Sequence, residues 1–246
     1  MRDQRIQSID FLRGLAMLLM ALDHVRLYFG QGNWYADPTN LDTTTPMLFF
    51  TRWVTHFCSP IFVFLAGTSA FLYGNKQSST KTLALFLFTR GLWLIFAELV
   101  IVNFAWTFDI TFSYIILQVI WAIGISMLVL SALVFLPTKI IALIGLLLVF
   151  GHNLLDSIKA YGAFPRDVLW YILHQEHVLY IGKSIVVAHY PVLPWIGLIA
   201  LGYAAGTFYT QGFNDEKRRR RLLWIGISAI ALFLLLRGFN LYGEPN

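Results

Sequence analysis

Residues 119–151 read VIWAIGISMLVLSALVFLPTKIIALIGLLLVFG, two apolar runs that meet at Pro137 and contain one charged residue, Lys139. Apolar windows of about 20 residues, which recur along the whole chain, are long enough for a helix to cross a hydrocarbon core of about 30 Å. The sequence therefore predicts an all-α protein, a polytopic membrane helical bundle whose surroundings are a lipid bilayer.

The composition also indicates a membrane protein. Apolar residues make up 58% of the 246 residues and charged residues 13%, about half of the roughly 25% that soluble domains carry. The net charge of +5 does not imply a nucleic-acid partner, because cytoplasmic membrane loops are basic for topological reasons. A single cysteine, Cys58, excludes an intramolecular disulfide.

Seven transmembrane helices are predicted within one domain that covers residues 1–246. The first is a retained helix, because it contains charged residues and lacks the small-residue cleavage pattern of a signal peptide. An additional amphipathic helix is expected on the membrane surface over Asp167–Ile181, where aromatic residues alternate with polar ones. The predicted spans are about 11–29, 50–73, 83–103, 114–136, 138–155, 192–210 and 222–240.

Basic residues predict the orientation. With the N-terminus inside, 11 of the 18 lysines and arginines lie on cytoplasmic segments, five of them in the run Lys217–Arg221. The expected outer loops at 30–46 and 104–113 have none. This asymmetry favours a cytoplasmic N-terminus and an external C-terminus. The basic run is interpreted as a topological anchor, with attraction of an anionic cytosolic cofactor as the alternative.

Ionisable residues inside a span are costly and therefore are candidates for a functional site. At a rise of about 1.5 Å per residue, His24 lies roughly 6 Å outward of its span's midpoint, and the polar residues of spans two to four lie about 8–10 Å outward. We expect these side chains to surround one outward-opening cavity. The residues at this level are His24, His56, Glu98 and Gln118, with His152, Asn153 and Asp156 at the outer end of span five.

Arg13 and His24 are 11 residues apart and share one face of the first helix, about 16 Å from each other. Histidine can exchange a proton near neutral pH, and arginine can hold phosphate by bidentate hydrogen bonds. This stripe suits a reaction that draws from both sides of the membrane. The alternative is that Arg13 is a topological anchor and that Asp23 and Arg26 form a structural pair.

The second span contains His56, Cys58 and Pro60. Pro60 is expected to kink the helix and to free the carbonyl of His56, four residues earlier. Packing alone would also explain such a kink. Cys58 is interpreted as a buried small apolar residue. Glu98 is either a general base or the partner of an arginine.

Three further features have open interpretations. Tyr114, Gln118 and Trp121 form one helical stripe, which serves either helix packing or substrate binding. Arg90 lies in the inner half of the third span and is a second candidate for binding a phosphate. His174 and His177 have a spacing that a metal could use, but no third ligand is evident and no metal is expected.

The opening motif, Ser8-Ile-Asp-Phe-Leu-Arg-Gly-Leu-Ala16 with Met20-Ala-Leu-Asp-His24, resembles the heparan-α-glucosaminide N-acetyltransferase-like proteins. The spacing from Arg13 to His24 is similar to that of the wider acyltransferase-3 superfamily. The resemblance covers essentially the whole chain and is nearest to the bacterial branch. It continues through the segments 51–68, 90–93, 117–124, 151–156 and 190–197, and through Glu98.

This resemblance implies transfer of an acetyl or acyl group from cytosolic acyl-CoA, across the membrane, to an extracytoplasmic sugar or envelope glycan. It gives His24 the place of the superfamily's catalytic histidine and Arg13 that of its arginine, and it implies a location in a bacterial inner membrane. Together with the residues chosen above by depth and spacing, the predicted sites are catalytic His24, His56 and Glu98, donor-binding Arg13 and Arg90, and acceptor-binding Asp23, Gln118, Trp121, His152, Asn153 and Asp156.

Two departures keep alternatives open. In human-type enzymes the proposed catalytic histidine lies in the loop after the first helix, whereas residues 30–46 here contain no histidine, so His56 competes with His24 as the base. Members of the family usually continue through further helices, so a domain truncated at its C-terminus is a second expectation. The acceptor, the acyl chain and the oligomeric state, a homodimer included, stay open.

The main alternative function is a transporter or channel that uses the polar level as a translocation path. Transporters tend to contain repeats with broken helices at the midplane. The sequence shows no internal repeat, and its polar level lies outward of the midplane, which favours the enzyme.

Overall fold

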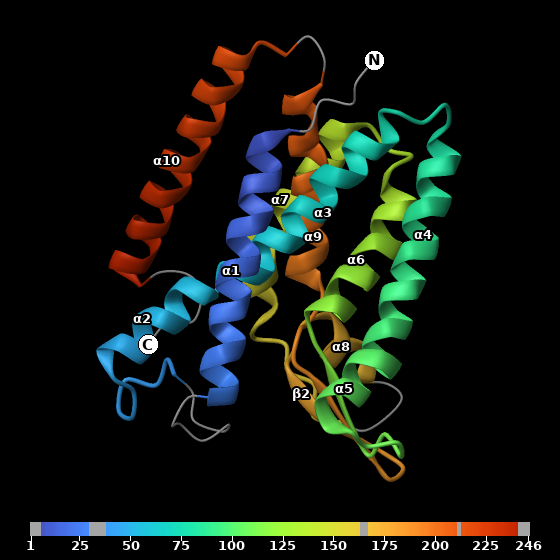
Figure 1. The fold of residues 1–246 in the computed structure, drawn as a ribbon, viewed down its shortest axis with the longest axis vertical. Helices are drawn as coiled ribbons and strands as arrows, with labels where there is room; N and C mark the ends of the chain where they lie inside the picture. Colours follow the sequence, from blue (N-terminus) through green and yellow to red (C-terminus); the bar gives the residue numbers. More distant parts are fainter. Residues whose placement is uncertain (1–5, 30–37, 163–166, 211–212, 241–246) are drawn as a thin grey trace. The chain divides into compact units, whose positions relative to one another are not determined.

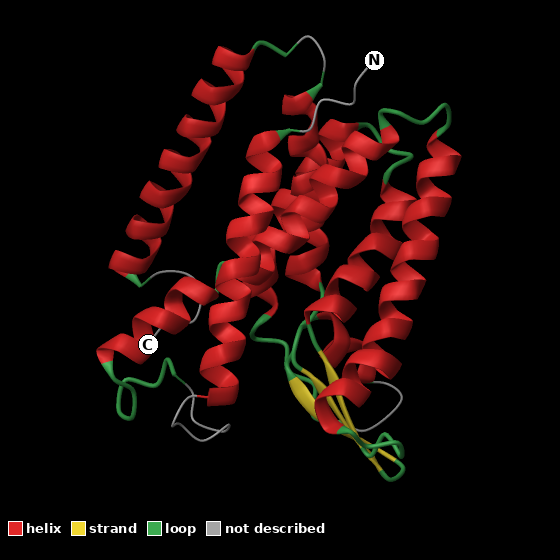
Figure 2. Ribbon diagram, viewed as in Figure 1, coloured by secondary structure: helices red, strands yellow, loops and turns green. Residues whose placement is uncertain are grey.

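The computed structural model describes residues 6–29, 38–162, 167–210 and 213–240. Helices form most of the structure, and three short strands form one small sheet (Figure 1 and Figure 2). The predicted helical bundle is confirmed in its general form, and the prediction of an all-α fold is wrong because of the sheet. The chain divides into two compact units, residues 1–66 and 67–246.

The first unit is built from α1 (Gln7–Phe29), α2 (Pro46–Thr55) and the beginning of α3 (Cys58–Gly74). The side-chain oxygen of Thr45 caps α2 by accepting a hydrogen bond from the Leu48 N–H (3.3 Å). The helix then stops at Thr55 and resumes at Cys58, immediately before Pro60. A kink was predicted at Pro60, and the structure shows an interruption of the helix at residues 56–57, just before it. Proline has no N–H with which to continue the ladder of helical hydrogen bonds.

The second unit contains the end of α3, the sheet and the remaining helices. The helix after α3 changes from α to π form and back again, so that α4, η1 and α5 make one continuous segment. The helices of the second unit after α3 are, in chain order, α4 (Thr80–Phe96), η1 (Ala97–Val102), α5 (Asn103–Thr107), α6 (Val119–Leu133), α7 (Thr138–Gly151), η2 (His152–Leu155), α8 (Val168–Leu173), α9 (Leu193–Ala205), η3 (Gly206–Tyr209) and α10 (Asp215–Phe239).

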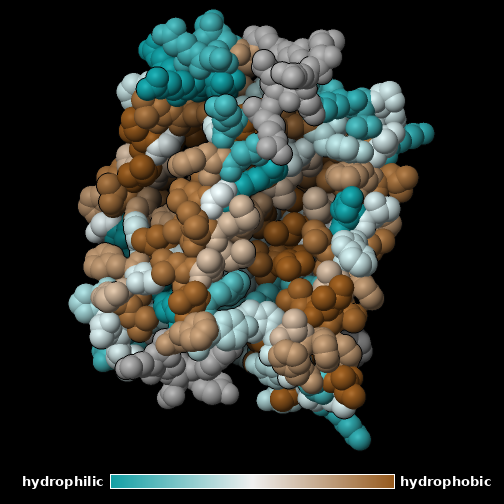
Figure 3. Space-filling view, in the orientation of Figure 1, coloured by the Kyte–Doolittle hydropathy of each residue, from teal (hydrophilic) through white to brown (hydrophobic). Residues whose placement is uncertain are grey.

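Four helical segments of the described chain are long and apolar enough to cross a membrane: Pro46–Gly74, Thr80–Thr107, Thr138–Leu155 and Asp215–Phe239. Hydrophobic side chains cover much of the visible surface (Figure 3). The predicted number of seven is not confirmed. The helices Val119–Leu133 and Leu193–Tyr209 are shorter, and α1 carries two acids and two arginines among its apolar residues.

The largest corrections concern the sheet. Its strands are β1 (Tyr114–Leu117), β2 (His177–Ile181) and β3 (Ser184–Ala188), in the order β1-β3-β2. The fourth predicted span therefore begins too early, because residues 114–117 are strand. The predicted surface helix over Asp167–Ile181 is helical only to Leu173 and is wrong beyond it. Its C-terminal half pairs with β3 in an antiparallel hairpin.

The signal for this hairpin was present in the sequence. Residues 178–181 and 185–188 are rich in β-branched and aromatic residues, and Gly182-Lys183 separates the two runs. Gly182 adopts a φ of 61°, which glycine tolerates at the first position of a two-residue hairpin turn. The parallel pairing of β1 with β3 brings the connection after α5 and the long segment after α7 to the same end of the second unit. Both were predicted on one side of the membrane.

Pairs of glycines let the long helices of the second unit approach closely. A Cβ atom on Gly91 of α4 would lie 2.8 Å from the carbonyl oxygen of Gly124 in α6. A Cβ atom on Gly145 of α7 would lie 2.9 Å from the carbonyl oxygen of Gly197 in α9. Small residues at crossings are the usual way for membrane helices to gain packing contacts. These crossings fix α6 and α9, whose N-terminal ends lie beside the sheet.

Candidate functional site

A hydrogen-bonded cluster around Asp23 joins α1 to α2 in the first unit. The Asp23 carboxylate accepts hydrogen bonds from Arg26 (2.7 Å), Arg52 (3.2 Å) and the hydroxyl of Thr55 (2.7 Å). The predicted pair between Asp23 and Arg26 is confirmed. Arg52 and Thr55 belong to the motif at 51–68 but were assigned no role, because sequence spacing cannot show a contact between two helices.

The two candidate bases, His24 and His56, follow directly after two members of this cluster. His24 succeeds Asp23 in α1 and is partly exposed, and His56 succeeds Thr55 at the interruption before α3 and is exposed. The hydrogen bond between Asp23 and Thr55 therefore ties together the two chain positions that carry these histidines. The exposed imidazole of His56 at the helix break can be reached by a substrate. Neither histidine is fully buried, so both remain candidates for the base.

Other residues of the first unit have simpler surroundings. Arg13 lies on α1 with 43% of its side chain exposed, 3.6 Å from the carboxylate of Asp10. The thiol of Cys58 is buried and lies 3.5 Å from the carbonyl oxygen of Ala16. This position agrees with the interpretation of Cys58 as a small buried residue that packs α3 against α1.

A second polar cluster lies at the π-helix of the second unit. Glu98 is fully buried, and one of its carboxyl oxygens accepts a hydrogen bond from the N–H of Gln118 (3.3 Å) at the start of α6. The two residues, which were predicted to lie at one level, therefore meet, and Trp121 lies in the first turn of the same helix. An ion pair between Glu98 and an arginine is absent from the described residues, where the second carboxyl oxygen has no hydrogen-bond partner.

Asn103 connects this cluster to the sheet. Its side-chain amide donates to the carbonyl oxygens of Glu98 (2.7 Å) and Ile116 (3.1 Å), and its side-chain oxygen accepts from the N–H of Ile116 (2.7 Å). The amide thus behaves like one more strand residue along β1. Sequence reasoning missed Asn103. An amide five residues after Glu98 inside an apolar helix would have been the signal for it, because buried polar groups need partners.

A third polar cluster connects η2, which follows α7, with the C-terminal end of α8. Asp156 accepts hydrogen bonds from the amide of Asn153 (3.1 Å) and pairs with Nε2 of His174 (3.0 Å). The ring of His152 lies 6.2 Å from that of His174, and its Nδ1 is 3.0 Å from the carbonyl oxygen of Val149. The structure therefore brings the three predicted residues of span five together and adds His174, which is nearly buried.

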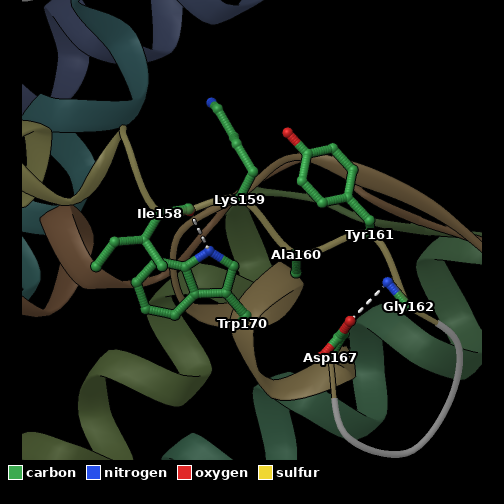
Figure 4. Close-up of a pocket in the computed structure, with 7 residues that line it drawn as sticks. All are labelled: Ile158, Lys159, Ala160, Tyr161, Gly162, Asp167 and Trp170. Atoms are coloured by element: carbon green, nitrogen blue, oxygen red, sulfur yellow. Dashed lines mark hydrogen bonds between the residues drawn. The ribbon is translucent and has the colours of Figure 1, made fainter.

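An open hollow of about 530 Å³ lies next to this third cluster (Figure 4). The indole N–H of Trp170 donates to the carbonyl oxygen of Ile158 (3.0 Å), and the carboxylate of Asp167 accepts from the N–H of Gly162 (2.6 Å). The Trp170 ring also packs 5.1 Å from that of His174. The side chains of Lys159 and Tyr161 extend outward beside the hollow (Figure 4).

His174 and His177 contact different residues and do not face a common site. The ring of His177 stacks on Tyr171 at 4.0 Å. Burial and the nearby Asp167 carboxylate raise the pKa of Tyr171, so its hydroxyl stays protonated and donates to the carbonyl oxygen of Gly162 (3.0 Å). Within the described residues, no group of three or more histidine, cysteine, aspartate or glutamate side chains could hold a metal ion.

The candidate residues thus gather at three helix junctions, one in the first unit and two in the second. Arg90 stands apart from the clusters of the second unit, exposed on α4 with its guanidinium 5.4 Å from the centre of the Phe86 ring. A single cavity shared by His24, His56, Glu98, Gln118 and His152 stays a prediction. The catalytic and binding roles assigned from the sequence stay predictions as well.

Apolar spanning helices with ionisable side chains at their junctions define an integral membrane protein. The family model that matches is "Heparan-alpha-glucosaminide N-acetyltransferase, catalytic", over residues 5–238. The chain belongs to this family, whose members are membrane acetyltransferases that use acetyl-CoA as donor. No curated protein and no solved structure matches the chain.

Proposed function

We propose that this protein transfers an acetyl group from cytosolic acetyl-CoA to a hydroxyl or amine of an extracytoplasmic sugar or envelope glycan, in the inner membrane of a bacterium. The observation that carries the proposal is the Asp23 cluster within a chain of this family. It ties the positions of both candidate bases to one junction between α1 and α2, on the helix that also carries Arg13.

Acetyl transfer requires one general base. The acceptor oxygen or nitrogen attacks the thioester carbon, its new bond to the acetyl group forms, and the carbon–sulfur bond breaks. His24 takes the proton of the acceptor and returns it to the CoA sulfur, which leaves as the thiol. A positioned base of this kind contributes about 10²–10⁴-fold to the rate. His56 is the alternative base.

Asp23 has a positioning role in this proposal. Its carboxylate is satisfied by two guanidinium groups and one hydroxyl, so it holds the junction rather than accepting a proton from the substrate. Arg13 lies about 16 Å from His24 along α1. With the N-terminus inside, that distance places Arg13 toward the cytosol, where the phosphates of CoA would arrive.

The test uses the full chain in liposomes with radiolabelled acetyl-CoA and an aminosugar acceptor. His24→Ala is expected to lower kcat about 10²–10⁴-fold with little change in acetyl-CoA binding, whereas Arg13→Ala is expected to raise the KM for acetyl-CoA. His189→Ala is the control, because His189 is half exposed, pairs with Glu176 and is not among the candidate site residues.

Two outcomes would change the proposal. If His24→Ala keeps normal turnover and His56→Ala abolishes it, the base is His56. If both variants keep normal turnover while the protein transfers acetyl groups, the junction between α1 and α2 is not the catalytic site. Transport of an unmodified sugar without any acetyl transfer would favour the transporter instead.

A further inference from the structure

An open groove of about 520 Å³ lies between η3 and the first turns of α10, far along the chain from the clusters described above. Three basic residues line it together with apolar and aromatic ones. The lining residues are Phe208, Lys217, Arg220, Arg221, Trp224 and Ile225.

The three cations share one face of α10. Residues at i, i+3 and i+4 are neighbours on a helix surface, so Lys217, Arg220 and Arg221 converge on the groove. No acidic residue is among the lining residues. The nearby acid Asp215 pairs instead with Arg218 (2.9 Å), and the Arg221 guanidinium lies 5.2 Å over the ring of Phe213. The groove therefore offers positive charge to an anion.

The groove is apolar along its other side. Trp224 and Ile225 are 58% and 54% exposed, and the exposed apolar surface of α10 continues from them to Phe239. Figure 3 shows hydrophilic side chains at the start of this helix and hydrophobic ones along it. Such a surface lies in hydrocarbon, and tryptophan is enriched at the level of the lipid head groups. The groove thus lies at the boundary between head groups and acyl chains.

We propose that this groove binds an anionic phospholipid. The phosphate lies among Lys217, Arg220 and Arg221, and an acyl chain lies along Trp224 and Ile225. Guanidinium groups bind phosphate by charge-assisted hydrogen bonds, and basic pockets beside transmembrane helices bind lipid head groups. A soluble phosphate would use the cations but would leave the apolar side exposed, whereas a phospholipid covers both.

Arg219 provides a matched control. Successive helix residues are about 100° apart, so Arg219 projects from the face opposite Lys217 and Arg221, and it does not line the groove. Arg219→Gln and Arg220→Gln remove the same charge from the same run, one residue apart. A general attraction between the basic run and a membrane would respond equally to both.

The experiment measures binding of phosphatidylglycerol and phosphatidylcholine to the full chain in neutral detergent by native mass spectrometry. Arg220→Gln is expected to weaken phosphatidylglycerol binding roughly fivefold, as one cation near a membrane surface contributes, and Arg219→Gln is expected to leave it unchanged. Trp224→Ala is expected to weaken binding of both lipids. Melting temperatures without added lipid show that the variants are folded.

Three outcomes would overturn the proposal. Equal losses in Arg219→Gln and Arg220→Gln would mean that the run acts only as a diffuse charge. Equal affinity for the two lipids would mean that the cations do not select the head group. Equally tight binding of soluble glycerol phosphate would mean that the site is for a soluble phosphate and that the apolar side contributes nothing.

Discussion

At the scale of single residues, Asn103 has the most consequential set of contacts in the second unit. One buried side chain satisfies both backbone groups of Ile116 and adds a second donor to the carbonyl of Glu98. The backbone N–H of Asn103 donates to the same carbonyl, which closes the π-helix. The position of Glu98 and the edge of β1 therefore depend on this one residue. π-Helical turns are rare overall and are frequent at functional sites.

Asn103→Leu is expected to lower the free energy of unfolding by about 2–6 kcal/mol, because the N–H and carbonyl groups of Ile116 lose their partner and each unpaired group away from water costs about 1–3 kcal/mol. Thermal unfolding in detergent measures the loss. Asn153→Leu is the comparison, since the Asn153 amide bonds only a half-exposed carboxylate. Equal losses in the two variants would contradict the assigned role of Asn103.

At the scale of elements, glycine crossings and helix interruptions position the clusters. The crossing of Gly145 and Gly197 holds α7 against α9, and the third cluster follows directly after α7 in η2. The interruption of α2 and α3 exposes His56 at its C-cap. Each candidate cluster thus lies where a regular helix ends or changes its form: at the break before Pro60, at the π-helix η1 and at the 3₁₀ turn η2.

The same substitution is expected to have opposite effects at two glycines. Gly145→Ala places a methyl group 2.9 Å from the carbonyl oxygen of Gly197, which forces the helices apart and destabilises the protein by about 1–3 kcal/mol. Gly226→Ala in α10 meets nothing within 4 Å, and alanine favours a helix over glycine by up to about 1 kcal/mol. Melting temperatures should therefore fall for the first variant and stay equal or rise for the second. A fall of equal size in both would show that the crossing is not tight.

At the scale of the whole molecule, the sheet relates distant parts of the second unit. β1 follows α5, and β2 and β3 follow α8, yet the parallel pairing of β1 with β3 places both connections at one end of that unit (Figure 1). Lys76 lies on the connection between α3 and α4, and Lys81 and the run Lys217–Arg221 lie in the first turns of α4 and α10. Charge asymmetry of this kind sets orientation in membranes.

Reporter fusions test the resulting topology. Fusions at residues 78 and 214 are expected to be cytoplasmic, and fusions at residues 40 and 175 external, because lysines and arginines are retained on the cytoplasmic side. An alkaline phosphatase and a fluorescent reporter at each position give complementary readouts. The opposite pattern would exclude both the topology and a reaction in which Arg13 meets a cytosolic donor.

The sequence by itself determined the class of protein, because a run of apolar residues long enough to cross the bilayer as a helix indicates a transmembrane helix. It also determined the family, through motifs distributed along the chain. The effect of Pro60 and the pair of Asp23 with Arg26 could be predicted because both depend on neighbours along one helix.

Only the tertiary structure decided the partners that come from far along the chain. Arg52 and Thr55 reach Asp23, Asn103 reaches Ile116, and His174 reaches Asp156, across separations that no local pattern records. The sequence carried a signal for the hairpin of β2 and β3 but none for the pairing of β1 with β3, which joins residues 114–117 to residues 185–188. Local periodicity describes how a segment can fold alone, whereas hydrogen bonds between segments select among its conformations.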